Sequence, residues 1–243
     1  MKWIVFVCIA VLAAFAVDPA HAQFVSERAI DSTNTAEIEE QKMVLRVLDS
    51  SSRREVRADV VVKGLNPRKP VVFRDIEDTT IVFKNYRLYT VSVVKKGYMY
   101  YARKFWPDES IQHIENIELK PLRVGLKTSV EDITFLGDQT EIYHKSLPAL
   151  EELLQFLKTN ENVKIMIIGH ANGPESEKKS PSVYKKGSEK RAEAVRDYLI
   201  QRGIQADRLA TRGAGNTQMI YPDPKTEWET QSNRRIEIEI IGL

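Results

Sequence analysis

The chain has 243 residues, of which 42% are hydrophobic and 29% are charged, and its 36 basic residues nearly balance its 34 acidic ones. This composition is typical of a globular protein with one large domain or two small ones, and it excludes a disordered chain. The net charge of +2 argues against a protein that binds nucleic acid by neutralising phosphates. A single cysteine excludes a disulfide framework and a zinc site built on cysteines.

The first 22 residues have the three parts of a secretory signal peptide. Lys2 precedes an apolar run over residues 3–17, which is shorter than the roughly 20 residues that a bilayer-spanning helix needs. Ala20 and Ala22 then form a small-residue cleavage signal, so we expect residues 1–22 to be removed. An uncleaved membrane anchor is the alternative.

The segment that follows the cleavage signal, residues 23–42, is polar and acidic with little apolar periodicity. We predict a flexible leader there. Cys8 lies within the signal peptide, too early to be the acylated cysteine of a lipoprotein, so we expect no lipid anchor. No later apolar run approaches the length of a membrane span, which predicts a soluble mature chain.

Residues 43–120 are predicted to form an antiparallel β-sandwich. Short β-branched or alternating segments are separated by turn residues about every ten positions, as in such sandwiches. This region holds 15 basic and 10 acidic residues. Its aromatic group, which includes Tyr98, Tyr100 and Tyr101, forms either a binding face or part of the core, and the core is the commoner case. The predicted strands are residues 43–48, 56–62, 79–83, 88–94, 98–105 and 111–119.

Residues 125–243 are predicted to follow the order β-α-β-α-β-β, which makes the overall fold class α+β. Ser146 and Ser188 are each expected to cap a helix, because a serine at the N-cap accepts a hydrogen bond from a free backbone N–H. Gly203 with Ile204 predicts a Schellman motif at the end of the second helix. The predicted helices are residues 146–159 and 188–202, and the predicted strands are residues 133–135, 163–168, 209–211 and 236–241.

This second region also contains a series of short motifs whose joint order and spacing are specific. These motifs are Gly169-His170, Ser188-Glu-Lys-Arg191-Ala192, Gly203-Ile204, Gly213-Ala-Gly215 and Asn233-Arg234-Arg235-Ile-Glu237. Together they resemble the OmpA-like C-terminal domain, a peptidoglycan-binding module of Gram-negative envelopes with a mixed sheet, over residues 125–243. Residues 43–120 resemble, more weakly, the carboxypeptidase-regulatory or transthyretin-like β-sandwich.

The resemblance implies non-covalent binding of the diaminopimelate residue in the peptidoglycan stem peptide, which presents carboxylates and an ammonium group. By position, Arg191 is the family's carboxylate-binding arginine, and Asn172 stands where the family has the aspartate that binds the ammonium. An asparagine accepts a hydrogen bond but supplies no countercharge. The other candidate binding residues are His170, Ser188, Asn233 and Arg234.

The residues themselves give Arg191 a physical role. If Ser188 caps the helix, Arg191 lies in its first turn, where free backbone N–H groups and the positive end of the helix dipole favour an anion. A guanidinium adds bidentate recognition of a carboxylate. A solvated or salt-bridged helix arginine is the alternative. Residues 174–187 are predicted as a loop with four lysines, and residues 213–215 as a loop after a strand.

We expect neither an enzyme nor a metal site nor a cofactor. The sequence has no Gly-x-Ser-x-Gly motif, no metal-ligand spacing and no convincing carboxylate pair. The expected function is that of a secreted periplasmic protein, associated with the cell wall or outer membrane, that binds peptidoglycan and tethers its β-sandwich there. Outer-membrane or periplasmic proteins are the candidate partners of the sandwich. The alternative is an adaptor with the same fold that acts through protein contacts and has little wall affinity.

Overall fold

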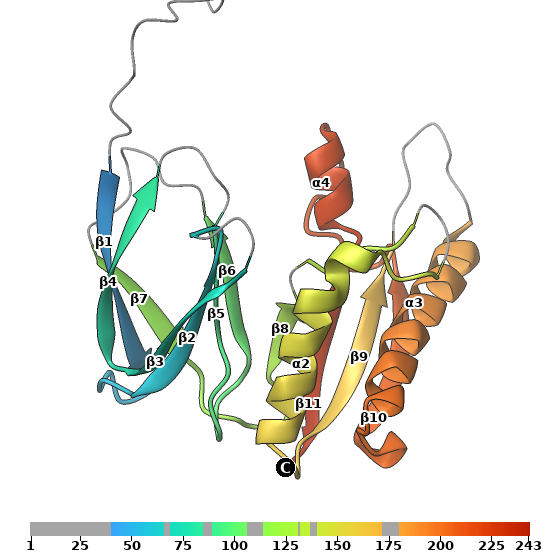
Figure 1. Cartoon of the computed structure of the whole chain (residues 1–243). Coiled ribbons are helices and arrows are strands. Elements are labelled where there is room, and N and C mark those ends of the chain that lie inside the picture. The colour runs from blue at the N-terminus through green and yellow to red at the C-terminus, as the bar shows by residue number, and fades with distance from the viewer. Residues whose placement is uncertain are drawn as a thin grey trace, which may run out of the picture. The chain divides into compact units, whose positions relative to one another are not determined.

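The computed structural model describes residues 40–65, 69–84, 89–105, 114–130, 132–136, 140–171 and 180–243 (Figure 1). The predicted signal peptide, Cys8, most of the predicted leader and Asn172 lie outside these residues. Among the residues that are described, no helix is both long enough and apolar enough to cross a membrane.

Residues 40–119 form two sheets, one with strand order β4-β1-β7 and the other with strand order β3-β2-β5-β6. Strands of both sheets contribute to one buried apolar cluster, to which Leu45 and Ile117 belong from the first sheet and Val60 from the second. The strands are β1 (Glu40–Asp49), β2 (Ala58–Lys63), β3 (Val71–Ile76), β4 (Asp78–Lys84), β5 (Tyr89–Val93), β6 (Tyr101–Phe105) and β7 (Ile114–Leu119).

Three features of these sheets differ from the sequence-based prediction. The pair β1 and β7 is parallel, so the expectation of a wholly antiparallel arrangement is wrong there. The two strands are far apart in the chain, so no hairpin forces them to run in opposite directions. Strand β3 was not predicted, because its apolar start is followed by the charged pair Arg74 and Asp75 and it has no regular alternation. The last residues of the predicted leader, from Glu40, belong to β1.

The tyrosines that were considered for a binding face are packed inward. Tyr100 is buried, and Tyr98 and Tyr101 pack against the cluster between the two sheets. The Tyr98 hydroxyl donates a hydrogen bond of 2.9 Å to Asp49, which satisfies its polar end. Tyr98 and Tyr101 therefore pack on the core between the two sheets, whereas Tyr100 is buried in a separate apolar cluster.

Residues 127–242 form a four-stranded mixed sheet with strand order β10-β9-β11-β8. Strands β9 and β10 are parallel, whereas β11 is antiparallel to both of its neighbours. Helices α2 and α3 lie along one face of this sheet (Figure 1). The elements are β8 (Lys127–Val130), η1 (His144–Ser146), α2 (Leu147–Thr159), β9 (Lys164–His170), α3 (Pro181–Gln201), η3 (Ala206–Arg208), β10 (Leu209–Gly215), α4 (Glu227–Ser232) and β11 (Ile236–Gly242).

The first predicted strand of this region is wrong. Residues 133–135 contain only an isolated bridge between Phe135 and Ile142, and the sheet begins earlier, with β8. The sequence of β8, Lys-Thr-Ser-Val, is too polar to predict a strand, and it forms because β11 supplies a partner at the edge of the sheet. The short helix α4 was also not predicted.

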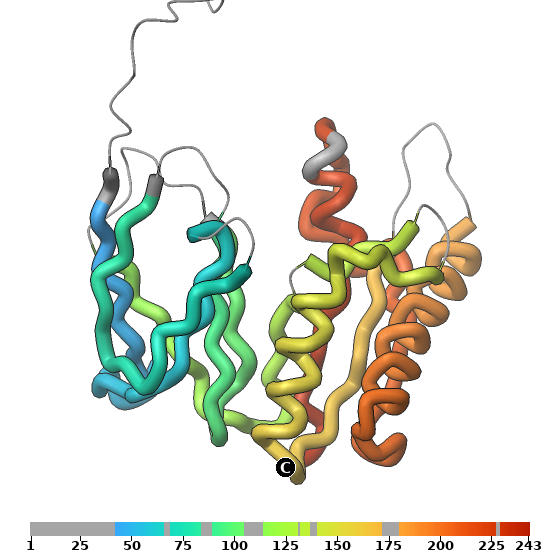
Figure 2. The backbone as a smooth tube through the Cα atoms, viewed as in Figure 1, coloured from blue at the N-terminus to red at the C-terminus, as the bar shows by residue number. Residues whose placement is uncertain are grey.

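The core between α2 and the sheet follows directly from the sequence pattern. Isoleucines at alternate positions of β9 and β11 are buried beneath the leucine stripe of α2, since alternate strand residues point to one face. Of the predicted stripe, Leu150, Leu154 and Leu157 are buried, whereas Leu147 at the helix start is 45% exposed. Figure 2 shows both helices running along the length of the sheet, so this packing extends over several turns.

Side chains hold both ends of α2. Ser146 lies at the N-cap position, as predicted, but its hydroxyl does not cap the helix. It accepts a hydrogen bond of 2.8 Å from the Thr134 amide instead, and so fixes the segment that carries Phe135. At the other end, the buried Arg208 guanidinium donates to three backbone carbonyls and thereby satisfies acceptors that the helix end leaves open. These carbonyls belong to Leu157, Asn160 and Val163.

Helix α3 begins at Pro181, seven residues before the predicted N-cap, so Ser188 lies inside the helix. Ser180 has an extended backbone, and Pro181 at the first helical position has its φ angle already fixed for a helix start. The second half of the predicted loop 174–187 is therefore helical. The expectation that Arg191 occupies a first helical turn is wrong for the same reason.

The end of α3 agrees with the prediction. Gly203 has a φ of 94°, and its amide donates a hydrogen bond of 2.9 Å to the Ile200 carbonyl. The Ile204 amide donates one of 3.1 Å to the Leu199 carbonyl, and the Ile204 side chain is buried in the core. These two bonds define a Schellman motif, which is confirmed.

Candidate functional site

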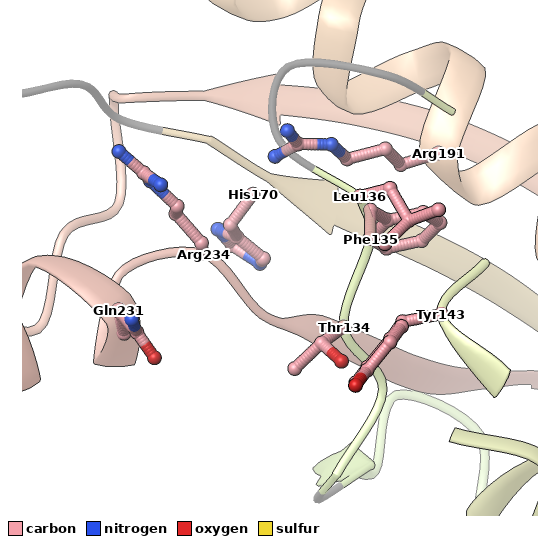
Figure 3. Close-up of a pocket in the computed structure, with 8 residues that line it drawn as sticks. All are labelled: Thr134, Phe135, Leu136, Tyr143, His170, Arg191, Gln231 and Arg234. Atoms are coloured by element: carbon pink, nitrogen blue, oxygen red, sulfur yellow. The ribbon is translucent and has the colours of Figure 1, made fainter. Parts of the chain in front are cut away.

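A pocket of about 480 Å³ opens at the end of the mixed sheet where β9 ends and β11 begins. We call it the arginine pocket, and Figure 3 shows the eight side chains that line it. The segment after β8, the segment before η1, the end of β9, α3, α4 and the turn before β11 each contribute to its wall. The lining residues are Thr134, Phe135, Leu136, Tyr143, His170, Arg191, Gln231 and Arg234.

Arg191 reaches the pocket from the buried face of α3. It shares this face with Ser188, Ala192, Val195 and Leu199, at the spacing that repeats along one side of a helix. Arg191 is only 8% exposed, and the central carbon of its guanidinium lies 5.3 Å from the centre of the Phe135 ring. A guanidinium above an aromatic ring is stabilised by the negative face of the ring. The sequence therefore places a cation where the rest of the helix face is apolar or small.

The position of Arg191 depends on a very close approach of α3 to the sheet. A methyl group on Gly169 in β9 would lie 2.0 Å from the Ser188 carbonyl oxygen, and one on Gly213 in β10 would lie 2.4 Å from the Lys185 carbonyl oxygen. A methyl group on Gly215, which has a φ of 56°, would lie 2.9 Å from the Lys185 amide nitrogen. These glycines are part of the sheet, so the prediction that residues 213–215 form a loop is wrong. Their missing side chains let the helix backbone rest directly on the strands.

The Ser188 hydroxyl links α3 to β10 through hydrogen bonds. Its hydroxyl donates to the Lys185 carbonyl at 2.8 Å, within the helix, and accepts from the Gly215 amide at 2.9 Å, at the end of β10. Ser188 has no exposed surface and does not line the pocket. It therefore joins α3 to the sheet, and Arg191 follows it on the same helix face.

His170, the last residue of β9, lies at the back of the pocket with a side chain that is only 1% exposed. Its Nε2 atom is 3.2 Å from a Glu237 carboxylate oxygen, although the contact is not aligned as a hydrogen bond. Neither ring nitrogen of His170 has a hydrogen-bond partner among the described residues. The His170 imidazole, and then the Arg235 guanidinium 2.7 Å away, lower the pKa of Glu237 to about 2 against the opposing effect of burial.

Asn233 and Arg234 have different roles although they are adjacent. Asn233 is buried, and its side-chain oxygen accepts hydrogen bonds from the amides of Ile220 and Tyr221 while its side-chain nitrogen donates to the Tyr221 carbonyl. Arg234 instead lines the arginine pocket. Asn233 thus fixes the backbone from which Arg234 extends.

The structure brings together three of the six predicted site residues, namely His170, Arg191 and Arg234. Ser188 and Asn233 support the site through the backbone, and Asn172 lies outside the described residues. The sequence did not predict the aromatic walls of the pocket, because Phe135 and Tyr143 are single aromatic residues in irregular segments. Gln231 was not predicted either, because it lies on α4, which was not predicted. The capping box of Thr226 and Glu229 was an available sequence signal for this helix. In the part of the chain that is described, no group of three or more potential metal ligands occurs.

Substitution of Gly169 tests whether the close approach of α3 fixes the pocket. Gly169→Ala places a methyl group against helix backbone, which must move, so we expect the free energy of unfolding to fall by about 2 kcal/mol or more. Gly187→Ala is the matched control, since a methyl group there meets nothing within 4 Å and alanine favours a helix. It should stabilise the protein by about 0.5–1 kcal/mol. Chemical denaturation measures both changes, and equal effects would contradict the role of the close contact.

The lowered pKa of Glu237 predicts a pH-dependent contribution to stability. The pKa falls from 4.5 to about 2 on folding, so the unfolded chain binds the proton first as the pH decreases. The carboxylate therefore stabilises the fold above about pH 4.5 and loses this effect towards pH 2. Glu237→Gln should lower the unfolding free energy by about 1–3 kcal/mol at pH 6, and by clearly less at pH 3. A deficit of the same size at both pH values would contradict the assignment.

Comparison with known sequences identifies residues 134–235 as a match to the OmpA family. Outer membrane protein A of Bordetella avium is 28% identical over 124 residues, which cover 51% of this chain and 61% of that protein. The photosystem I P700 chlorophyll a apoprotein A2 of Gloeobacter violaceus is 28% identical over 133 residues, which cover 52% of this chain and 15% of that protein. The chain thus spans less than two thirds of either relative.

Solved structures also resemble about half of the chain. The peptidoglycan-associated lipoprotein from Burkholderia pseudomallei matches 46% of this chain and 88% of its own, with 21% identity and a TM-score of 0.39. The cell wall anchor of the type VI secretion system (T6SS) from Pseudomonas aeruginosa matches 48% of this chain and 80% of its own, with 20% identity and a TM-score of 0.39. The part of this chain from residue 134 to residue 235 is thus OmpA-like by its sequence match.

Proposed function

We propose that the arginine pocket binds a carboxylate of the peptidoglycan stem peptide, and that this contact holds the protein at the cell wall without catalysing a reaction. The observation that carries the proposal is the position of Arg191, whose nearly buried guanidinium lines the pocket above Phe135. All eight lining residues fall within residues 134–235, the part of the chain that matches the OmpA family.

A guanidinium in this setting is suited to a carboxylate. It offers two parallel N–H donors to the two carboxylate oxygens, and hydrogen bonds between charged groups contribute about 1.5–3 kcal/mol each. Limited access of water strengthens the attraction relative to an exposed pair. Phe135 and Tyr143 supply apolar walls for the aliphatic part of a bound side chain.

Within this proposal, diaminopimelate is the residue of the stem peptide that is recognised. Arg191 holds its carboxylate, while Arg234 and His170 act from the same pocket. Ser188 and Asn233 hold the backbone that positions these groups. Asn172 remains a contact to the ammonium group that is proposed from the sequence alone.

The proposal extends to the whole protein. Residues 1–22 direct secretion, residues 23–42 are largely a leader, and residues 125–243 bind the wall at the periplasmic side or at the outer membrane. Residues 43–120 form a carboxypeptidase-regulatory-like sandwich that contacts envelope proteins. The buried cluster shared by its two sheets supports the sandwich arrangement alone. The name of the Bordetella avium relative, outer membrane protein A, supports a location in the envelope. An adaptor with the same fold and little wall affinity is the alternative.

Co-sedimentation with purified peptidoglycan sacculi tests the proposed function. We expect the wild-type protein to pellet with sacculi and Arg191→Ala to lose at least about tenfold in affinity, because the charge-assisted bonds to a carboxylate are removed. Arg191→Lys should fall between the two, since lysine keeps the charge but cannot form the bidentate contact.

Arg196→Ala is the matched control. Arg196 lies on the same helix and pairs with the adjacent Asp197, so its loss removes the same charge without touching the arginine pocket. Its affinity should equal that of the wild type, and thermal melting should show that each variant is folded. If the wild-type protein stays in the supernatant, the result favours the adaptor. If Arg191→Ala and Arg196→Ala lose the same affinity for sacculi, the binding is due to general charge attraction and not to the arginine pocket.

A further inference from the structure

One strand of the sandwich, β5, is buried on both of its faces. A strand in an antiparallel sandwich commonly alternates between residues that face the core and residues that face water. The inward residues of β5, which are Tyr89, Val91 and Val93, belong to the cluster between the two sheets. Its outward residues Thr90 and Ser92 are nevertheless only 7% and 1% exposed. Another part of the protein therefore covers the outer face of this strand.

Helix α2 of the OmpA-like region lies beside this face. Residues 39–243 form one compact unit, and the apolar core around α2 includes Met99 and Tyr100, which immediately precede β6. Val94, the next outward residue after β5, and Ala102 on β6 pack against the same core. Val94 also lines one groove together with Glu152 of α2. The core of the OmpA-like region thus continues into the sandwich.

Glu152 joins α2 to the sandwich through both oxygens of its carboxylate. One oxygen lies 2.8 Å from the Lys63 Nζ atom at the end of β2, and the other accepts a hydrogen bond of 2.8 Å from the Tyr100 hydroxyl. The side chains of Glu152 and Lys63 are 14% and 21% exposed, and limited access of water strengthens the attraction between them. The adjacent Glu151 instead pairs with Arg202 beyond the end of α3.

The connection between β7 and β8 is hydrogen-bonded to both regions. The Leu122 amide donates a hydrogen bond of 2.9 Å to the Gly97 carbonyl in the sandwich, and the Gly125 amide donates one of 2.8 Å to the Ile240 carbonyl in β11. The Gly97 amide in turn donates one of 2.8 Å to the side-chain oxygen of Asn160, at the end of α2. This connection is therefore held in place along its length.

A further contact reaches the segment that forms one wall of the arginine pocket. Lys104 on β6 forms an ion pair with Asp132, and the next residue, Ile133, is buried in the core of the OmpA-like region. Two residues further along the chain is Phe135, whose ring lies beneath the Arg191 guanidinium. The sandwich thus holds the start of the segment that positions this ring.

We propose that the sandwich and the OmpA-like region form one rigid body, in which the sandwich supports α2 and the wall of the arginine pocket. The sandwich is then not a module on a flexible tether, and a partner bound to it is held in one orientation relative to the arginine pocket. The inference goes beyond the proposed function, because it does not depend on the ligand that the pocket binds.

Limited proteolysis with trypsin tests the proposal on the purified protein. Arg123 is exposed and lies in the connection between the two regions, so trypsin cuts after it readily only when this connection comes free. We expect Glu152→Ala to raise the rate of this cut at least about tenfold, because the loss of the Lys63 ion pair and the Tyr100 hydrogen bond increases the open population. Mass spectrometry identifies the cut.

Glu151→Ala is the matched control. Glu151 is the neighbouring residue on α2, and its loss removes the same charge but breaks only an exposed ion pair with Arg202 inside the OmpA-like region. Its rate of cleavage after Arg123 should equal that of the wild type. Tyr100→Phe is the second variant if Glu152→Ala does not fold, and it should raise the rate by a smaller factor. Equal rates for Glu151→Ala and the variant used would overturn the proposal.

Residual dipolar couplings measured by NMR test the fixed orientation directly. In the wild type, amide couplings from the strands of the sandwich and from those of the mixed sheet should fit a single alignment tensor, since a rigid body has one orientation. Two tensors of different magnitude would overturn the proposal.

These measurements separate the inference from the proposed function. Protein that shows one tensor but does not pellet with sacculi keeps the inference and loses the proposed function. Protein that pellets through Arg191 but shows two tensors keeps the proposed function and loses the inference.

Discussion

The site depends on one steric constraint, the direct contact of the α3 backbone with strands β9 and β10. Glycine at positions 169, 213 and 215 removes the side chains that would hold the helix away, and the Ser188 hydroxyl joins the two surfaces. The distance between helix and sheet is therefore set by backbone contacts, which cannot yield as flexible side chains can. Because Arg191 lies on the same helix face, less than one turn beyond Ser188, its place above Phe135 follows from this contact.

Much of the fold follows from the sequence, because burial and turn chemistry are local signals. The leucine stripe of α2, the β-branched run of β9 and the Gly203 stop of α3 could each be predicted from their spacing. The start of α3 could not be predicted from Ser188, since a serine inside a helix and a serine at its cap look alike in sequence. Ser180 followed by Pro181 was the better signal. Strand β8 has almost no signal of its own and depends on β11.

The basic residues of the candidate site were predicted from the sequence, but the aromatic residues of its walls were not. Arg191, Arg234 and His170 belong to recognisable motifs, whereas the aromatic walls come from irregular segments that only the tertiary fold brings together. The reason first given for an anion at Arg191, a free helix N-terminus, does not apply because α3 begins at Pro181. The structure gives a different reason, because the nearly buried Arg191 guanidinium lies over an aromatic ring in a pocket that Arg234 also lines.

The most direct test of the account is a crystal structure of the protein with a soluble stem peptide that ends in diaminopimelate. We expect a carboxylate of the peptide within about 3 Å of the Arg191 guanidinium, with the aliphatic chain between Phe135 and His170, because this guanidinium is held in the pocket before the ligand arrives. A peptide bound elsewhere on the protein, with the arginine pocket unchanged, would contradict it.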